Sequence, residues 1–131
     1  MDEFTVKTGK QADMIDITAQ VGAAVAKTGI RQGVCTIFTP HTTAGITINE
    51  NADPDVIHDI LMEMHKAIPQ QDGYRHLEGN SAAHIKSSLF GCSASVIISD
   101  GRLQLGTWQS IFFCEFDGPR TRKTWVQVVG G

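Results

Sequence analysis

The segment Tyr74–Gly91, YRHLEGNSAAHIKSSLFG, gathers side chains that can bind metal ions, phosphates or protons. It carries two histidines, His76 and His84, with the carboxylate of Glu78 between them. Gly79 lets the chain bend sharply before an expected helix, so the loop residues can fold back toward His84. Two imidazoles and a carboxylate around an open position are a usual ligand set of catalytic zinc, and three histidines are another.

A second histidine lies in the stretch 40–45, PHTTAG, a polar break between two expected core strands. His41, flanked by hydroxyl groups at a strand end, is well placed to bind a metal or to transfer a proton. The alternatives are a loop histidine whose ring satisfies a local carbonyl group and, for His84, a helix-terminal residue that makes a capping contact. The spacing matches no linear metal motif such as HExxH, so the residues alone leave both interpretations open.

Later stretches of the chain can add polar groups to the same site. The GTWQ stretch, 106–109, could close a pocket wall, with the Gln109 amide contacting a substrate; a strand with a packed tryptophan is the alternative. Glu115 falls among large apolar neighbours, where a carboxylate is costly unless it is paired or ligated. Arg120 could bind an anion or could be a solvated turn residue, and Asn49 ends an expected strand.

The hydrophobic pattern indicates the elements that must position these side chains. It predicts strands over 4–7, 14–17, 34–39, 45–50, 96–98, 103–107, 108–116 and 124–129, and helices that begin near Thr18, Asp53-Pro54 and Ser81. Asp100-Gly101 is a typical pair for a type I′ hairpin turn. Expected buried helix positions are Val21, Ala24 and Val25 in the first helix, and Val56, Ile57, Ile60, Leu61 and Met64 in the second. In the third helix, Ile85 and Leu89 share one apolar stripe. The sequence therefore predicts a single α+β domain over 1–131, sandwich-like, with mostly antiparallel β-sheets and two to three packed helices.

Composition excludes several classes of protein. The formal net charge of the 131 residues is -3, whereas a nucleic-acid binder usually carries a basic field. No apolar run approaches the roughly 20 residues of a membrane span, and the acidic N-terminus does not resemble a secretory signal. We therefore expect a cytoplasmic protein without a nucleic-acid or membrane partner. Cys35 and Cys114 fall in expected strands and are interpreted as small buried hydrophobic residues.

Three motifs, PHTTA, HxEGNxxAH and GxxxxGTWQ, together resemble the YjbQ-like family, an uncharacterised protein family, over nearly the whole chain. The resemblance implies an α+β sandwich-like fold and a homotrimer. It also implies a secondary thiamine-phosphate synthase activity, with which one member is associated. In that reaction hydroxymethylpyrimidine diphosphate and thiazole phosphate join, and pyrophosphate is released.

The resemblance also implies how the polar residues are used. The clustered histidines of the family correspond to His41, His76 and His84, which look like a site for a divalent metal, with zinc as the expected ion, at or near a subunit boundary. The density of polar groups, rather than the resemblance, motivates an enzyme hypothesis for the other residues. Its expected catalytic residues are Glu78, Glu115 and Gln109, and its expected contacts to a small phosphorylated substrate are Asn49, Asn80, Lys86 and Arg120. In this enzyme hypothesis the metal acts on a diphosphate leaving group or on a bound water.

Two other functions use the same residues. The first is a non-catalytic trimeric module that binds a metal or a small anion, in which the histidines stabilise the oligomer. The second is a metal-dependent hydrolase of a phosphate ester, because a ligand set alone does not separate transfer from hydrolysis. A site that keeps an open position favours catalysis, whereas a closed tetrahedral site favours a structural role.

Overall fold

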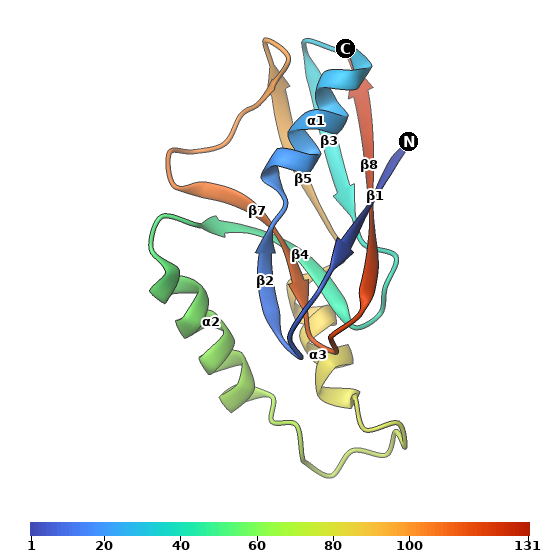
Figure 1. Cartoon of the computed structure of the whole chain (residues 1–131), viewed down its shortest axis with the longest axis vertical. Coiled ribbons are helices and arrows are strands. Elements are labelled where there is room, and N and C mark those ends of the chain that lie inside the picture. Colours follow the sequence, from blue (N-terminus) through green and yellow to red (C-terminus); the bar gives the residue numbers. More distant parts are fainter.

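Two antiparallel sheets and three helices make up the computed structural model, which describes residues 1–131 (Figure 1). The five-stranded sheet has the order β1 (Asp2–Lys7), β8 (Thr121–Gly130), β3 (Gly33–Phe38), β5 (Ser93–Ser99) and β6 (Arg102–Leu103). The three-stranded sheet has the order β2 (Asp13–Asp16), β7 (Gln109–Glu115) and β4 (Ala44–Glu50). The helices are α1 (Thr18–Thr28), α2 (Pro54–Ala67) and α3 (Ser81–Phe90). The predicted α+β sandwich-like fold is confirmed.

Strand β7 lies at the centre of the molecule and is buried on both faces. Ile111 and Phe113 belong to the larger core, between the two sheets and α1. Phe112 and Cys114 belong to a smaller core, against which residues of α2 and α3 pack. Alternate residues of β7 thus face different cores, and both faces of the strand are covered. The three-stranded sheet therefore forms a middle layer between the five-stranded sheet and the two later helices (Figure 1).

Helix α1 buries the three residues that its sequence pattern predicts, Val21, Ala24 and Val25. It ends at Gly29, whose φ of 67° is the left-handed conformation that glycine adopts at little cost. Thr18 was expected to cap the helix but is its first helical residue. Its hydroxyl instead accepts a hydrogen bond from the Ile111 backbone N–H at 2.8 Å, which joins the start of α1 to β7.

Helix α2 begins as predicted, because the Asp53 side chain accepts a hydrogen bond from the Asp55 N–H at 2.9 Å and Pro54 occupies the first turn. Its apolar stripe packs on the smaller core through Ile57, Ile60 and Leu61. No residue of α2 is fully buried, however, so the stripe is only half covered. In Figure 1 the helix lies along the outer edge of the molecule.

Helix α3 has the opposite arrangement from an ordinary amphipathic helix. Its buried residues are small or polar (Ala82, Ala83, Lys86 and Ser87), whereas the predicted apolar stripe faces outward, with Leu89 64% exposed. The small residues allow a close approach to β4, and the Ser87 hydroxyl donates to the Ala44 carbonyl oxygen at 2.6 Å. On the β4 side, a Cβ at Gly45 would lie 2.9 Å from the Phe90 Cβ, so this packing requires glycine.

The hairpin between β5 and β6 has the predicted turn, with φ of 52° at Asp100 and 74° at Gly101. The return strand is shorter than expected, because β6 covers only Arg102–Leu103 and residues 104–108 form a loop before β7. None of the three helices combines the length and hydrophobicity that crossing a bilayer requires.

Candidate functional site

A polar hollow of about 310 Å³ opens where the segments that follow β3, precede α3 and follow β7 meet. Ten residues line it, and all except a proline are polar or charged: Pro40, His41, Thr42, Thr43, Glu78, Asn80, His84, Asp117, Arg120 and Arg122. These residues come from three distant parts of the sequence. Five of the predicted site residues (His41, Glu78, Asn80, His84 and Arg120) therefore lie around one hollow.

A buried ion pair between Glu115 and Arg122 forms the floor of the hollow. The guanidinium donates from Nε to Glu115 Oε1 at 2.8 Å and from Nη2 to Oε2. The same carboxylate accepts from the Thr8 hydroxyl at 2.7 Å and from the Asp117 N–H at 3.0 Å. Burial would raise the pKa of the Glu115 carboxyl, but these hydrogen bonds outweigh it and hold the pKa below its ordinary value. Glu115 thus keeps its charge while fully enclosed.

The ion pair also holds the loop that carries His41. Arg122 Nη2 donates to the Thr43 hydroxyl at 2.9 Å, and the Phe116 N–H donates to the Thr43 carbonyl at 3.2 Å. The loop that carries His41 is consequently fixed by contacts to Phe116, just after β7, and to Arg122 of β8.

On the opposite side, Asp117 joins two other residues of the hollow. Its Oδ2 accepts from Asn80 Nδ2 and from Arg120 Nη2, each at 3.0 Å. Asn80 precedes α3 and makes no side-chain capping bond, and its Oδ1 is buried without a hydrogen-bond partner. The Arg120 side chain is 55% exposed, so it can move toward a ligand more easily than the enclosed Arg122 can.

The ring of His41 accepts a hydrogen bond at Nε2 from the backbone N–H of Lys123, at 2.8 Å. Burial and the positive charge of Arg122 lower the pKa of His41. The imidazole is therefore neutral at physiological pH. It lines the polar hollow and also a second hollow of about 500 Å³ that reaches Cys92.

The rings of His76 and His84 meet edge to face, with centroids 5.5 Å apart. His84 lines the polar hollow, the hollow near Cys92 and a third one of about 420 Å³, which is lined by Tyr74, Arg75, His76, Ser81, His84 and Ile85. Glu78 Oε2 lies 3.9 Å from His76 Nε2. The predicted return of the loop toward His84 is thus observed, with Gly79 at a φ of 80°.

The three predicted metal ligands do not converge within one chain. His76 and His84 come together, but His41 is held at its Nε2 by the Lys123 N–H. No group of three or more His, Cys, Asp or Glu side chains in the chain is arranged to hold a metal ion. The side chains of a single chain therefore do not supply the ligand set that the resemblance implies, and the metal stays a prediction.

Comparison with known proteins decides the family. The family model described as UPF0047 protein YjbQ-like matches residues 2–131. The chain belongs to this family. It is 52% identical to a UPF0047 protein of Methanocaldococcus jannaschii over 98% of this chain and 93% of that protein. It is also 56% identical to the UPF0047 protein YugU of Bacillus subtilis, over 95% of this chain and 96% of that one.

Solved structures of YjbQ-like proteins have the same fold. A crystal structure from Clostridium acetobutylicum superposes with a TM-score of 0.97 at 53% identity, covering 98% of this chain and 100% of that one. A structure from Sulfolobus solfataricus, described as a protein of unknown function, superposes with a TM-score of 0.95 at 35% identity, over 99% of this chain and 96% of that one.

Besides His76, which lines only the third hollow, four of the predicted site residues do not line the polar hollow of this YjbQ-like chain. Glu115 lies beneath it in the ion pair. Gln109 and Asn49 lie near the other end of the β4–β7 ladder, where Glu50 pairs with Gln109 and Asn49 with Ser110. Their predicted roles stay predictions, but any substrate contact they make occurs away from the histidines of the same chain.

Lys86, the fourth, points toward α2 rather than into the hollow, and its ammonium group donates to His65 Nδ1 at 2.9 Å. Burial lowers the pKa of Lys86, and burial together with the Lys86 charge lowers the pKa of His65. His65 is an exposed residue of α2, and its ring also joins α2 to α3 through this hydrogen bond. The other histidine of that face, His58, is exposed and contacts only the neighbouring Asp59.

Arg122 and Asp117 line the hollow but are not among the site residues that the sequence predicts. A signal for Arg122 was available, because it shares the alternation of Thr124 and Val126, both buried in β8. A cation at an inward position of a strand requires a buried partner, and Glu115 occupies an inward position of β7. Neither Asp117 nor Thr43 shows a comparable signal.

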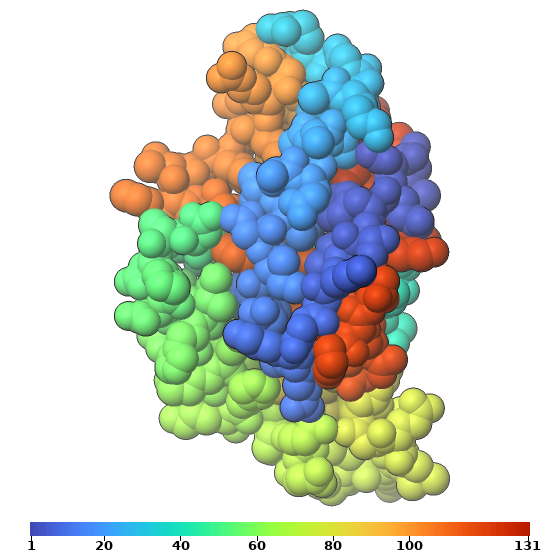
Figure 2. Space-filling model, viewed as in Figure 1, coloured from blue at the N-terminus to red at the C-terminus, as the bar shows by residue number.

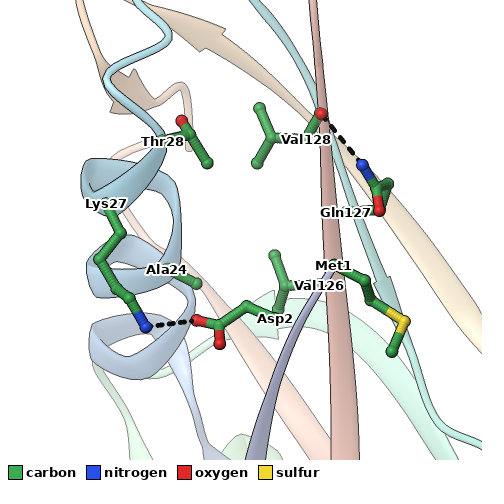
Figure 3. A pocket seen from close by; sticks show the side chains of 8 residues that line it. All are labelled: Met1, Asp2, Ala24, Lys27, Thr28, Val126, Gln127 and Val128. Carbon is green, nitrogen blue, oxygen red and sulfur yellow. Dashed lines mark hydrogen bonds and ion pairs between the residues drawn. The ribbon is translucent and has the colours of Figure 1, made fainter.

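A separate hollow of about 340 Å³ lies between α1 and strands β1 and β8, far along the chain from the histidines. Figure 3 shows Lys27 reaching from α1 to Asp2, with a distance of 3.2 Å between Nζ and Oδ2. None of the predicted site residues lines this hollow. The space-filling view shows α1 and β1 beside each other on this face (Figure 2). The residues expected to carry chemistry therefore gather elsewhere, at the polar hollow.

Proposed function

We propose that this protein is a transferase of the secondary thiamine-phosphate synthase type, with a small phosphorylated substrate. It would join hydroxymethylpyrimidine diphosphate to thiazole phosphate. The thiazole nitrogen attacks the methylene carbon of the pyrimidine compound, the carbon–oxygen bond breaks, and pyrophosphate leaves. The observation that supports this proposal is a polar hollow with two arginines and two histidines, adjacent at His84 to a second hollow.

The two hollows suit different halves of such a substrate. Arg120, Thr42 and the backbone N–H groups at the start of α3 can bind diphosphate oxygens, because guanidinium groups and helix N-termini favour anions. The adjacent hollow, with the rings of Tyr74 and His76, can take a flat heteroaromatic ring. A substrate that combines an aromatic ring with an anionic group is therefore the class that we propose.

Both arginines of the site are already paired with carboxylates, so an anionic ligand must replace one of these partners to bind. Arg122 is compensated by Glu115, and Arg120 is compensated by Asp117 in a more exposed pair. A diphosphate would compete with Asp117 for Arg120. The carboxylate of Glu78 is exposed at the rim, and we keep it as the candidate for proton transfer at the open side.

The metal and the homotrimer are proposals that rest on the family resemblance. A metal at His76 and His84 would require at least one further ligand, such as a side chain from a neighbouring copy. Elemental analysis of the purified protein and its sedimentation behaviour test these two proposals. No step proposed above depends on a metal.

The test is an assay of the purified protein with the two precursors, which follows thiamine phosphate and pyrophosphate. We expect His84→Ala to lower the rate by about a hundredfold, the usual lower size of a lost acid–base or positioning group. His58→Ala, on the exposed face of α2, is the matched control and should keep the rate. An unchanged rate in His84→Ala would exclude the proposed site.

Omitting the thiazole phosphate distinguishes transfer from hydrolysis. Release of pyrophosphate at the same rate without this acceptor would favour the phosphate-ester hydrolase. Binding of pyrophosphate without any turnover would favour the non-catalytic anion-binding module. Either result would replace the transferase proposal.

A further inference from the structure

The hydrogen bond between Lys123 and His41 determines which ring nitrogen of His41 carries the proton. A backbone N–H can only donate, so His41 Nε2, which lies 2.8 Å from it, must be unprotonated. A neutral imidazole with a bare Nε2 carries its proton on Nδ1.

The pairing of the strands explains why the backbone N–H of Lys123 has a side-chain acceptor instead of a strand carbonyl. Strand β3 pairs with β8 as far as Phe38, which lies opposite Trp125. The same register continued by two residues would place Pro40 opposite Lys123. The chain leaves the sheet there, since proline cannot take part in a central ladder as a donor. The His41 ring thus replaces a strand carbonyl as the acceptor for β8.

Contacts on both sides hold the ring in this position. The Thr39 N–H donates to the Cys92 carbonyl at 2.8 Å before the loop, and Arg122 donates to the Thr43 hydroxyl after it. The Nδ1 atom makes no hydrogen bond within the protein, and it is absent from the buried atoms that lack a partner. The atom is therefore not fully buried, and His41 lines two hollows.

We infer that His41 is a fixed, neutral Nδ1–H donor that contacts an anionic oxygen of the bound ligand, and that it is neither a metal ligand through Nε2 nor a general base. The ligand part of this inference rests on the proposed function; the assignment of the proton does not. A diphosphate or phosphate oxygen matches this donor, because a hydrogen bond to a charged acceptor is about twice as strong as a neutral one. The proton remains on the ring, and no bond forms or breaks at His41.

The first experiment measures the histidine ring nitrogens of the isotope-labelled protein by long-range proton–nitrogen NMR at neutral pH. The His41 signals are identified by their loss in His41→Gln. We expect a protonated Nδ1 and an unprotonated Nε2, with no change when zinc is added. A protonated Nε2, a doubly protonated ring, or a zinc-dependent shift of the His41 nitrogens would overturn the inference, whether or not the protein has the proposed activity.

The second experiment measures binding of pyrophosphate by calorimetry. His41→Ala should weaken binding by about tenfold or more, as expected for loss of one hydrogen bond to a charged group. His41→Gln should recover binding to within about threefold, because its amide can accept from Lys123 and still donate to the ligand. A glutamine variant as weak as the alanine variant would overturn the donor role. If the wild-type protein does not bind pyrophosphate, the proposed function fails, and so does the ligand part of this inference.

Discussion

The two ends of the β4–β7 ladder both carry polar residues, yet they have different structures. At one end Ala44 pairs with Glu115, and the carboxylate is 0% exposed and holds Arg122 and Thr8. At the other end Glu50 pairs with Gln109, beside a Trp108 that is 62% exposed. The same pair of strands therefore ends in an enclosed polar network on one side and in a solvated edge on the other.

The difference comes from the segments that cover each end. The residue after β1, the loop after β3 and the start of β8 all converge on the Glu115–Arg122 ion pair. Gln109 has only a local contact, in which its Oε1 accepts from the Gly106 N–H at 2.8 Å. A polar residue at a strand end is thus strongly held only where other chain segments exclude water and provide partners.

The largest expected difference between the two ends is in the free energy of unfolding. Arg122→Ala leaves the Glu115 carboxylate buried without its partner, which should cost roughly 3–5 kcal/mol. Gln109→Ala, the control at the exposed end, should change stability by less than about 0.5 kcal/mol. Denaturant unfolding measures both. Equal losses of unfolding free energy in Arg122→Ala and Gln109→Ala would show that burial does not distinguish the two ends of the ladder.

A pair of glycines tests the same comparison through packing. A Cβ at Gly118 would lie 2.2 Å from the Lys10 carbonyl oxygen and 2.8 Å from Glu115 Cγ, so Gly118→Ala should cost roughly 1–3 kcal/mol. At Gly106 the Cβ would meet only the flexible Gln109 side chain, at 3.2 Å. We expect Gly106→Ala to remain within about 0.5 kcal/mol of the wild type. If Gly118→Ala kept the wild-type stability, the enclosed end of the ladder could readily expand to accept the added methyl group.

A smaller effect should appear in the pH dependence of stability. The pKa of Glu115 is lower in the folded protein than its ordinary value of 4.5, so the unfolded state binds the proton first as the pH falls. The stabilisation is therefore complete above that ordinary value and is lost as the pH falls toward the lower folded pKa. Unfolding measured across this range should show a steeper acid loss in the wild type than in Glu115→Gln.

The smallest expected effect concerns Trp108. Because its side chain is exposed, Trp108→Ala should change the unfolding free energy by less than about 0.5 kcal/mol. Sedimentation of the same variant reports on the proposed homotrimer. A loss of stability above about 1 kcal/mol, the typical size for a residue with buried contacts, would show that another chain covers this end in solution.

Much of the fold follows from local patterns. The starts of α2 and α3, the inward residues of α1 and the turn at Asp100-Gly101 all lie where the sequence predicts them. The errors concern long-range packing. Strand β6 is shorter than predicted because residues 104–108 leave the sheet to reach β7, and Leu89 of α3 faces outward because the smaller residues on the other side of that helix fit against β4.

The site was predicted in part. His41, Glu78, Asn80, His84 and Arg120 share one hollow, and the pairing of His76 with His84 follows from a loop that a glycine bends. Other residues could not be placed from the sequence. A buried lysine such as Lys86 has no local signature, because its partner His65 lies 21 positions away on another helix.

The sequence by itself determined where the helices begin, which residues of α1 face inward, and which chemical groups are present, because these depend on neighbours a few positions apart. Only the tertiary structure decided which groups bind Glu115 and that His41 accepts from β8. Their partners lie far along the chain, with 107 positions between Thr8 and Glu115 and 82 between His41 and Lys123. No local pattern encodes such contacts, since they arise when the assembled sheets bring distant backbone groups together and exclude water around them.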